Sequence, residues 1–455
     1  MLAQVGAGFS GETIGHDAER GKPDGTALLF EPRTVTLHAT MSEPVTPPPT
    51  RRWIRSPLPV IALFVVLGAF LSQPLLRDAS TRLPAPGVEL VRPWLYVALA
   101  PLSNIFDNWS LLDLPQHIAL LATVLVGVVA FRIRAMRSGT SAKREMAAAA
   151  AVIGGIALFV VTGALLPRPM ARLMVADSSI VRVDFHSHTS ASHDGRWGFN
   201  VEANRRWHRN GGFDVAYITD HATFAAAEEG EKANPPRATD GTTLLSGLEV
   251  RSMAEHLNYL GMHAIDTVLL HERERLPRGT AMRSTGRPPL VLQTIPIHEY
   301  AQVIHLRDDS VARLDAIEIN DAAPKGLAQL ERDRAHILAL SDSLRLTRVA
   351  GSDNHGWGRT AVAWTLIQIP GWRALAPDSL GSAIERTVRD APQFVRVVER
   401  FSPAHGDSPL QLAMTAPLLL WRMFATLTLG ERISWIAWLA VLGFAARRRE
   451  VQAIR

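Results

Sequence analysis

Cysteine is absent from the 455 residues of this chain. Its absence excludes disulfide bonds and every metal site built on thiolate ligands, so a metal in this protein would have to be held by histidine and carboxylate side chains. Internal repeats are also lacking, and the chain is longer than one typical domain. At least two structural units are therefore expected.

The centre of the chain has almost equal numbers of basic and acidic residues. Residues 178–400 hold 26 lysines and arginines against 28 aspartates and glutamates, although the whole chain has a formal charge of +5. The basic surplus therefore lies beside apolar segments elsewhere, where it is typical of membrane topology signals rather than of a nucleic-acid-binding surface. No nucleic-acid partner is expected.

Long apolar runs flank this near-neutral centre. Residues 1–56 are polar and rich in glycine, proline and threonine, and we expect them to be disordered, with Met41 as an alternative start. Residues 57–170 are expected to form a membrane region with about three transmembrane helices, because the apolar runs are long enough to cross a bilayer. These spans are expected at 57–76, 114–131 and 146–166.

Residues 401–455 are expected to form a C-terminal membrane segment with one span at 433–446. The apolar stretch 410–429 carries Arg422 in its middle, so it is not expected to cross. The stretch 88–106 is interrupted by charged, polar and proline residues and is expected to be interfacial. The positive-inside rule then predicts an integral membrane protein whose central domain is extracytoplasmic.

The pattern of residues 178–400 predicts a separate α/β domain. Short β-branched runs alternate with helical stretches, which favours a parallel, barrel-like sheet. The polar stretch 263–297 is expected to be an insertion or a loop near the mouth of the site. Strands are expected at 180–185, 213–219, 243–250, 256–262, 301–306, 314–320, 347–353 and 361–369, and helices at 199–210, 325–344 and 378–390.

Histidine is abundant in this domain. Twelve of the sixteen histidines lie between positions 186 and 355, mostly where the expected strands end. His186 and His188, in VDFHSHT, are two residues apart, so both side chains point to one face of an extended strand. Asp353 and His355, in GSDNH, repeat the spacing with a carboxylate. A single strand-end histidine is commonly structural, but two such pairs in one domain indicate a metal site.

Other candidate ligands follow other expected strands. They are Asp194 in SHDG, His221 in YITDH, Glu249 in SGLEV, His256 in EHLNYLG and His305 in QVIHL. In a barrel of parallel strands the strand ends converge on one mouth. Such a set of imidazoles and carboxylates can hold two or three divalent metal ions, with the carboxylates offsetting the charge.

Taken in this order, DFHSHTSASHDG, ITDH, SGLEV with HLNYLG, and GSDNHG resemble the motifs of the polymerase and histidinol phosphatase (PHP) superfamily over about 180–400. The resemblance implies an α/β fold, a distorted (β/α)7 barrel of the PHP type, here flanked by transmembrane α-helices. It also implies a two- or three-metal centre at the carboxyl ends of the strands and metal-dependent hydrolysis, most often of phosphoesters. Carried over position by position, the implied metal ligands are His186, His188, Asp194, His221, Glu249, His256, His305, Asp353 and His355.

One position departs from the family pattern. The family usually has Asn-His-Pro where this chain has Ile304-His305-Leu306. His298, in IPIHEY, is therefore the substitute candidate for this ligand.

The expected function is that of a membrane-anchored, metal-dependent phosphoesterase. Zinc, manganese or iron ions would lower the pKa of a water and produce hydroxide near neutral pH. Asp220 is a candidate for orienting an imidazole or transferring a proton, with capping of a turn as the alternative. Arg359 is a candidate for phosphate binding, with an ion pair under a loop as the alternative. Glu318 and Asn320 alternate onto one strand face and are candidates for supporting the ligands.

Two other functions stay open at this point. One is a metallohydrolase of a carbamate, an amide or another ester, and no sequence feature separates it from a phosphoesterase. The other is a non-catalytic extracytoplasmic sensor or binding module. The expected partners are a phosphorylated or ester substrate and the lipid bilayer.

Overall fold

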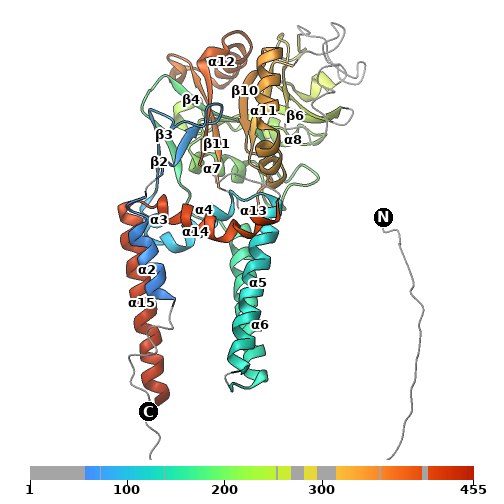
Figure 1. Ribbon diagram of the computed structural model, residues 1–455. Coiled ribbons are helices and arrows are strands. Elements are labelled where there is room, and N and C mark those ends of the chain that lie inside the picture. Colours follow the sequence, from blue (N-terminus) through green and yellow to red (C-terminus); the bar gives the residue numbers. More distant parts are fainter. Residues whose placement is uncertain are drawn as a thin grey trace, which may run out of the picture. The chain divides into compact units, whose positions relative to one another are not determined.

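The structure is a computed structural model (Figure 1). The expected segment 1–56, the expected strand 301–306, and His298, His305 and Arg359 lie outside the residues that it describes. The described residues are 57–71, 73–137, 139–252, 255–267, 281–294, 314–357, 360–401 and 408–454.

A curled sheet of ten strands forms the centre of the α/β domain. Four neighbouring pairs are parallel and the other five are antiparallel, so the sheet is mixed rather than wholly parallel. The strands, in their order across the sheet, are β1 (Leu76–Asp78), β12 (Val395–Arg400), β11 (Ala363–Gln368), β4 (Ile180–Ser187), β5 (Val215–Ile218), β6 (Thr243–Ser252), β7 (Glu255–Leu260), β8 (Leu290–Gln293), β9 (Ala316–Asp321) and β10 (Thr347–Gly351).

The two ends of the run from β4 to β10 meet. The backbone N–H groups of Ser352 and Asp353, just after β10, donate to the carbonyl oxygen of His186 in β4. Within this run β6, β7 and β8 pair antiparallel, so the described residues do not establish the regular (β/α)7 count. They also correct the expectation for 263–297, because β8 is a buried strand of the sheet rather than part of a loop.

Burial explains the strands and the helices that cover them. Every residue of β5 and β9 is buried, which is typical of strands covered on both faces. The three expected helices are present, and a fourth, α8, carries too short an apolar pattern to be predicted. The covering helices are α7 (Val201–Gly211), α8 (Ala225–Lys232), α11 (Pro324–Leu344) and α12 (Pro377–Asp390). A two-stranded sheet of β2 (Val88–Val91) and β3 (Arg172–Val175) lies beside α7.

Three helices in the described residues are long and apolar enough to cross a membrane. Each has at least 21 residues in its apolar span, about 30 Å or more at a rise of about 1.5 Å per residue. They are α5 (Leu114–Arg137), α6 (Ala142–Leu165) and α15 (Leu429–Ile454).

The expected span 57–76 differs from the structure. Its helix, α2 (Leu58–Leu67), has 10 residues and covers about half the thickness of a bilayer core. Leu58 lies near Gly443 of α15, and an Arg432 side chain donates to the carbonyl of Val65. The short helix therefore runs antiparallel to α15 and packs on it.

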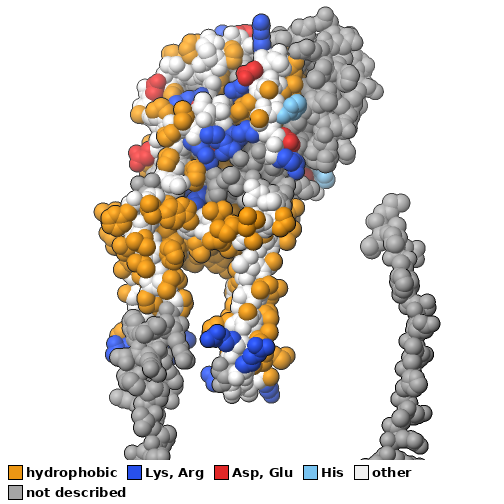
Figure 2. Space-filling view, in the orientation of Figure 1, with side chains coloured by type: hydrophobic (Ala, Val, Ile, Leu, Met, Phe, Trp, Pro, Cys, Tyr) orange, Lys and Arg blue, Asp and Glu red, His pale blue; other side chains and the backbone are white. Residues whose placement is uncertain are grey.

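Short helices join the membrane helices to the domain. They are α3 (Trp94–Ala98), α4 (Ala100–Trp109), α13 (Pro409–Ala413) and α14 (Thr415–Ala425). Figure 2 shows hydrophobic side chains gathered over this group of helices. Neither 88–106 nor 410–429 forms a helix long enough to span a bilayer, in line with the expectation from the charge of Arg422 in the middle of 410–429. Arg422 itself is buried in α14.

Asp107 ties this helical layer to the sheet domain. Its carboxylate is fully buried and lies 2.9 Å from the guanidinium nitrogens of both Arg168 and Arg400, the latter at the end of β12. The hydroxyl of Tyr96 donates to it at 2.8 Å. Burial opposes the charge, but the two arginines hold the pKa of this carboxyl well below its ordinary value. Asp107 is therefore a buried anion shared by α3, α4 and the sheet.

Candidate metal centre

The end of β4 presents the first two imidazoles. Because side chains two residues apart share a face of a strand, His186 and His188 both point into the curve of the sheet. Both are buried, and their Nε2 atoms lie 3.0 Å apart. Asp184 fixes the strand from behind: it accepts from the N–H groups of His186 and Ser352 and from His208 at 2.8 Å.

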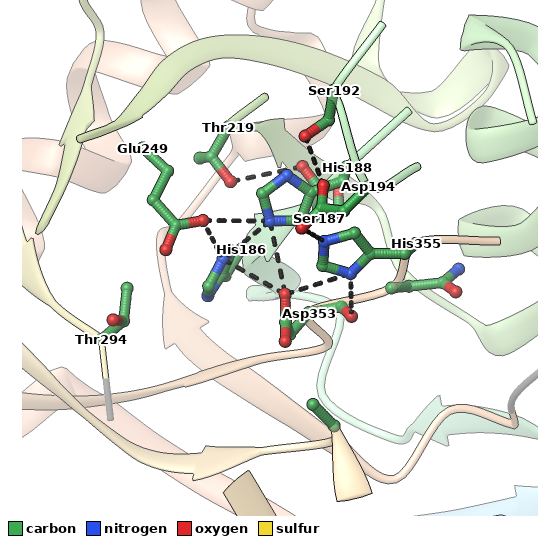
Figure 3. Close-up of polar contacts among 12 residues, drawn as sticks. His186, Ser187, His188, Ser192, Asp194, Thr219, Glu249, Thr294, Asp353 and His355 are labelled. Atoms are coloured by element: carbon green, nitrogen blue, oxygen red, sulfur yellow. Dashed lines mark hydrogen bonds and ion pairs between the residues drawn. The ribbon is translucent and has the colours of Figure 1, made fainter. Parts of the chain in front are cut away.

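Four donor atoms form one compact group around this pair (Figure 3). Glu249 Oε2, from β6, lies 2.9 Å from His186 Nε2 and 3.1 Å from His188 Nε2. Asp353 Oδ1 lies 3.5 Å and 3.3 Å from the same two nitrogens. Tetrahedral ligands at about 2.0–2.2 Å from zinc are about 3.3–3.6 Å from one another. The donor atoms of His186, His188 and Glu249 are therefore close enough to share one cation, and Asp353 Oδ1 lies beside the two imidazoles.

Glu249 also faces a second group of ligands. Its Oε1 lies 2.6 Å from His256 Nδ1, and its Oε2 lies 3.6 Å from His221 Nε2. The antiparallel pairing of β6 with β7 brings His256 close to Glu249, and His221 forms an isolated bridge with Glu249 after β5. One carboxylate thus borders two candidate metal sites.

A third group lies on the outer side of His188. Asp194 Oδ2 is 3.1 Å from His355 Nε2 and 3.6 Å from His221 Nε2. The rings of His188 and His355 stack at 4.1 Å between centroids. These four residues also offer donor atoms close enough to share an ion.

Asp353 reaches the centre through an uncommon backbone conformation. Its φ is +43°, a left-handed value that costs free energy in residues other than glycine. This turn follows directly after β10 and directs the carboxylate towards His186 and His188. Such strain is typical of functional sites.

Glu318 supports the ring of His186 from below. Its Oε1 lies 3.0 Å from His186 Nδ1, so the Nε2 atom is free to face the other ligands. Gly351 makes room for this contact, since a Cβ there would lie 2.2 Å from the Glu318 carboxylate. Asn320, the other candidate on this strand face, instead donates to Glu399 at 2.8 Å.

Asp220 lies behind the centre. It is fully buried, and its two oxygens accept from the N–H and the hydroxyl of Thr189 at 2.6 Å each. Its distance of 3.9 Å from His188 Nδ1 is too long for a hydrogen bond. These contacts show that Asp220 holds the turn after β4, whereas the alternative expected from the sequence was the turn after its own strand, β5.

In the centre, the negative charge of the carboxylates and the positive charge of the imidazoles stabilise one another. Burial opposes ionisation of Glu249, yet the neighbouring imidazoles, His186 above all, hold the pKa of its carboxyl well below the ordinary value. Burial also opposes the charge of His186, but the carboxylates of Glu249 and Glu318 raise its pKa well above the ordinary value. Metal binding displaces protons from such ligands, so a cation would take over the balancing charge.

The structure brings together eight of the nine residues expected as ligands. The ninth, His305, and the expected phosphate-binding residue Arg359 lie outside the described residues. The Asp184–His208 pair was not expected, because His208 lies in a helix and pairing across 24 residues leaves no local signal. The eight residues are His186, His188, Asp194, His221, Glu249, His256, Asp353 and His355.

No family profile and no curated protein matches the chain. A solved structure with limited likeness is PsfC from Pseudomonas syringae, at 14% identity over 53% of this chain and 96% of that chain, with a TM-score of 0.29. Another is a two-domain protein from Bacteroides vulgatus containing a predicted PHP-like metal-dependent phosphoesterase, at 14% identity over 51% and 69%, with a TM-score of 0.29.

A third is a protein of Bifidobacterium adolescentis described as a metal-dependent phosphoesterase, at 15% identity over 45% of this chain and 96% of that chain, with a TM-score of 0.28. At these values the likeness assigns neither a family nor an activity. The function of this chain is therefore inferred from its own clusters of histidine and carboxylate groups that could hold metal ions.

Proposed function

We propose that the domain of residues 178–400 is a metal-dependent hydrolase of phosphoesters, anchored to a membrane. The observation that carries the proposal is the group of four donor atoms from His186, His188, Glu249 and Asp353, in which both imidazole nitrogens lie 2.9–3.5 Å from each carboxylate. Such convergence of buried imidazoles and carboxylates fits divalent cations of the zinc, manganese and iron class.

The donor set fits two or three ions. Besides the four-atom group, Glu249 with His256 and Asp194 with His355 border two further candidate sites, and His221 Nε2 would complete one of them. Bound there, such ions supply Lewis acidity to a phosphoryl oxygen and lower the pKa of a water. They also offset the carboxylate charge that would otherwise repel a phosphate.

The chain's own residues orient and seal the centre. Glu318 holds the His186 ring, and Asp220 holds the turn that carries His188. His186, His188 and Glu249 are each at most 3% exposed, whereas the side chains of Asp194 and His256 at the edge of the centre are 42% and 32% exposed. A cavity lies beside Asp194 and His355, so substrate would enter past these two residues.

Metal content and substrate class test this proposal on the purified full chain. We expect two or three zinc, manganese or iron ions per chain by elemental analysis, loss of activity with a chelator, and hydrolysis of phosphate esters ahead of aryl esters and amides in a matched panel. Less than about one ion per folded chain would overturn the metal centre. Preference for a carbamate, amide or carboxylic ester would replace the phosphoesterase by another metallohydrolase, and a metal-loaded protein without activity would favour a sensor.

We further propose that the catalytic domain is extracytoplasmic. α5 begins and α6 ends next to the domain, so their connection, with the basic residues of 132–144, lies at the far ends of both helices. The first turns of α15 contact α4, so the other end of α15 is the one far from the domain. That far end carries three arginines, 447–449. Cytoplasmic positive charge then places the domain on the opposite side.

Reporter fusions test this orientation. Fusions after residues 140 and 455 are expected to report a cytoplasmic position, and a fusion after residue 180 an external one. A cytoplasmic signal at 180 would place the enzyme inside and leave its chemistry untouched.

A further inference from the structure

We propose that the substrate is a membrane lipid, with its phosphoester head at the metal centre and its apolar chain against the helices α4 and α6. This inference rests on the proposed phosphoesterase function and names its substrate class. It is carried by a cavity of about 460 Å³ that joins the centre to the membrane helices.

The cavity has two unlike walls. One wall is polar and belongs to the metal centre: Asp194, Asp353 and His355 line it. The opposite wall is apolar and includes Phe106 of α4 and Val160 of α6. A ligand that fills the cavity must therefore carry a group suited to metal ions at one end and a hydrocarbon at the other.

The apolar wall is part of a membrane-spanning helix. Phe159, Val160, Gly163 and Ala164 all lie in the last two turns of the span α6, nearest the domain. Leu158 and Val161, on its other face, are 64% and 51% exposed, as expected of side chains that face lipid. The cavity thus lies beside the end of the apolar span that is nearest the domain.

The wall is closely packed. The rings of Phe106 and Phe159 stack with centroids 4.0 Å apart. Gly163 permits this approach, because a Cβ there would lie 1.7 Å from the Phe106 ring. The aromatic wall therefore results from the close crossing of α4 and α6, and each methylene of a chain buried against it would strengthen binding.

Positive charge lies at the same edge of the membrane helix. A second cavity of about 250 Å³ shares Ala164 with the first and extends over Leu165 and Leu166 to Arg196 and Arg206. Trp357, 53% exposed, lines the first cavity beside the metal centre. Arginine and tryptophan at this depth are typical of sites that face anionic lipid headgroups.

A water-soluble phosphoester carries no hydrocarbon chain to pack against the apolar wall. A soluble phosphoester would contact the polar wall alone, whereas residues of an apolar helix long enough to cross a membrane form the other side of the cavity. For phosphatidate, water adds its oxygen to phosphorus, the bond from phosphorus to the glycerol oxygen breaks, and that oxygen takes up a proton. The products are diacylglycerol and inorganic phosphate.

The test compares substrates that share a headgroup and differ in their chains. The full-length, metal-loaded protein in mixed micelles is assayed with glycerol 3-phosphate, dihexanoyl phosphatidate and dioleoyl phosphatidate, and with the matching glycerophosphodiesters. We expect kcat/KM to rise at least about tenfold from the chain-free to the long-chain compound of the preferred ester class, the equivalent of about 1.4 kcal/mol.

Val160→Trp fills the apolar wall, and Val161→Trp, on the lipid face of the same helix, is its matched control. We expect Val160→Trp to lower kcat/KM for the long-chain lipid at least about tenfold more than for the chain-free ester; Val161→Trp should alter neither. A photoreactive group at the end of the acyl chain should label residues 156–167 in metal-free wild type and not in Val160→Trp.

Three results would overturn the inference. Equal kcat/KM for all chain lengths, equal losses in both tryptophan variants, or labelling outside α4 and α6 would show that the chain does not occupy this cavity. The phosphoesterase would survive each of them if the chain-free ester is hydrolysed. No hydrolysis of any phosphoester by the metal-loaded protein would overturn the proposed function and this inference together.

Discussion

Replacing Glu249 by glutamine is expected to reduce phosphoester hydrolysis by roughly a thousandfold or more and to remove at least one metal ion per chain. Glu249 Oε2 lies within 3.1 Å of both His186 and His188, and Oε1 lies 2.6 Å from His256. A neutral amide supplies one weak oxygen where the carboxylate supplies two charged ones. Two candidate ion sites would therefore lose a ligand in one substitution.

Two further variants make this result specific. Glu318→Gln keeps a hydrogen-bond acceptor for His186 and should cost about 10–100-fold with the metal retained, since Glu318 contacts the imidazole of a proposed ligand. Glu202→Gln, on the exposed side of α7, should leave activity and metal content unchanged. The measurements are kcat/KM and elemental analysis. Activity of Glu249→Gln within about tenfold of wild type would contradict its place in the centre.

Replacing Asp107 by asparagine is expected to destabilise the full chain by about 3–5 kcal/mol. Arg400 is 5% exposed and lies 2.9 Å from the Asp107 carboxylate, which is also the partner of Arg168. The substitution preserves volume but leaves buried guanidinium charge uncompensated. Because these contacts join α4 to the end of β12, the loss should fall on the attachment of the domain to its helices.

The pH dependence of stability should change as well. The folded-state pKa of Asp107 is lowered, so its contribution is fully present above the unfolded value, about 4, and is lost as pH falls towards the folded value. Wild type in detergent should therefore lose more stability below about pH 4 than Asp107→Asn does. Thermal unfolding measures both effects, with exposed Asp240→Asn as the control. Equal melting temperatures for Asp107→Asn and wild type would refute the role of this anion.

The residues of the centre could be predicted because their signals are local. His186 and His188 end a β-branched run, and the two-residue period of a strand puts them on one face whatever the rest of the chain does. The apolar runs of α5, α6 and α15 are likewise long enough to cross a membrane, a property that depends on local composition and on no partner. Composition also excluded thiolate ligands before any contact was known.

The tertiary structure alone decided how these pieces meet. Glu318 and His186 are 132 residues apart, and Asp107 and Arg400 are 293 apart, so no period along the chain joins them. The antiparallel course of β6, β7 and β8 depends on which strand edges pair, and periodicity reports the face of a strand but not its neighbour.

The same reasoning applies to the membrane side of the molecule. The apolar run 57–76 predicts a complete span, yet helix α2 ends at Leu67. The cavity exists because α4 crosses α6 at Gly163 and the turn after β10 reaches the same point. The sequence alone determined the chemistry of the donor atoms and the presence of helices long and apolar enough to cross a membrane. That the donor atoms and an apolar helix line the same cavity follows from long-range packing, because local residue patterns do not encode which surfaces face one another.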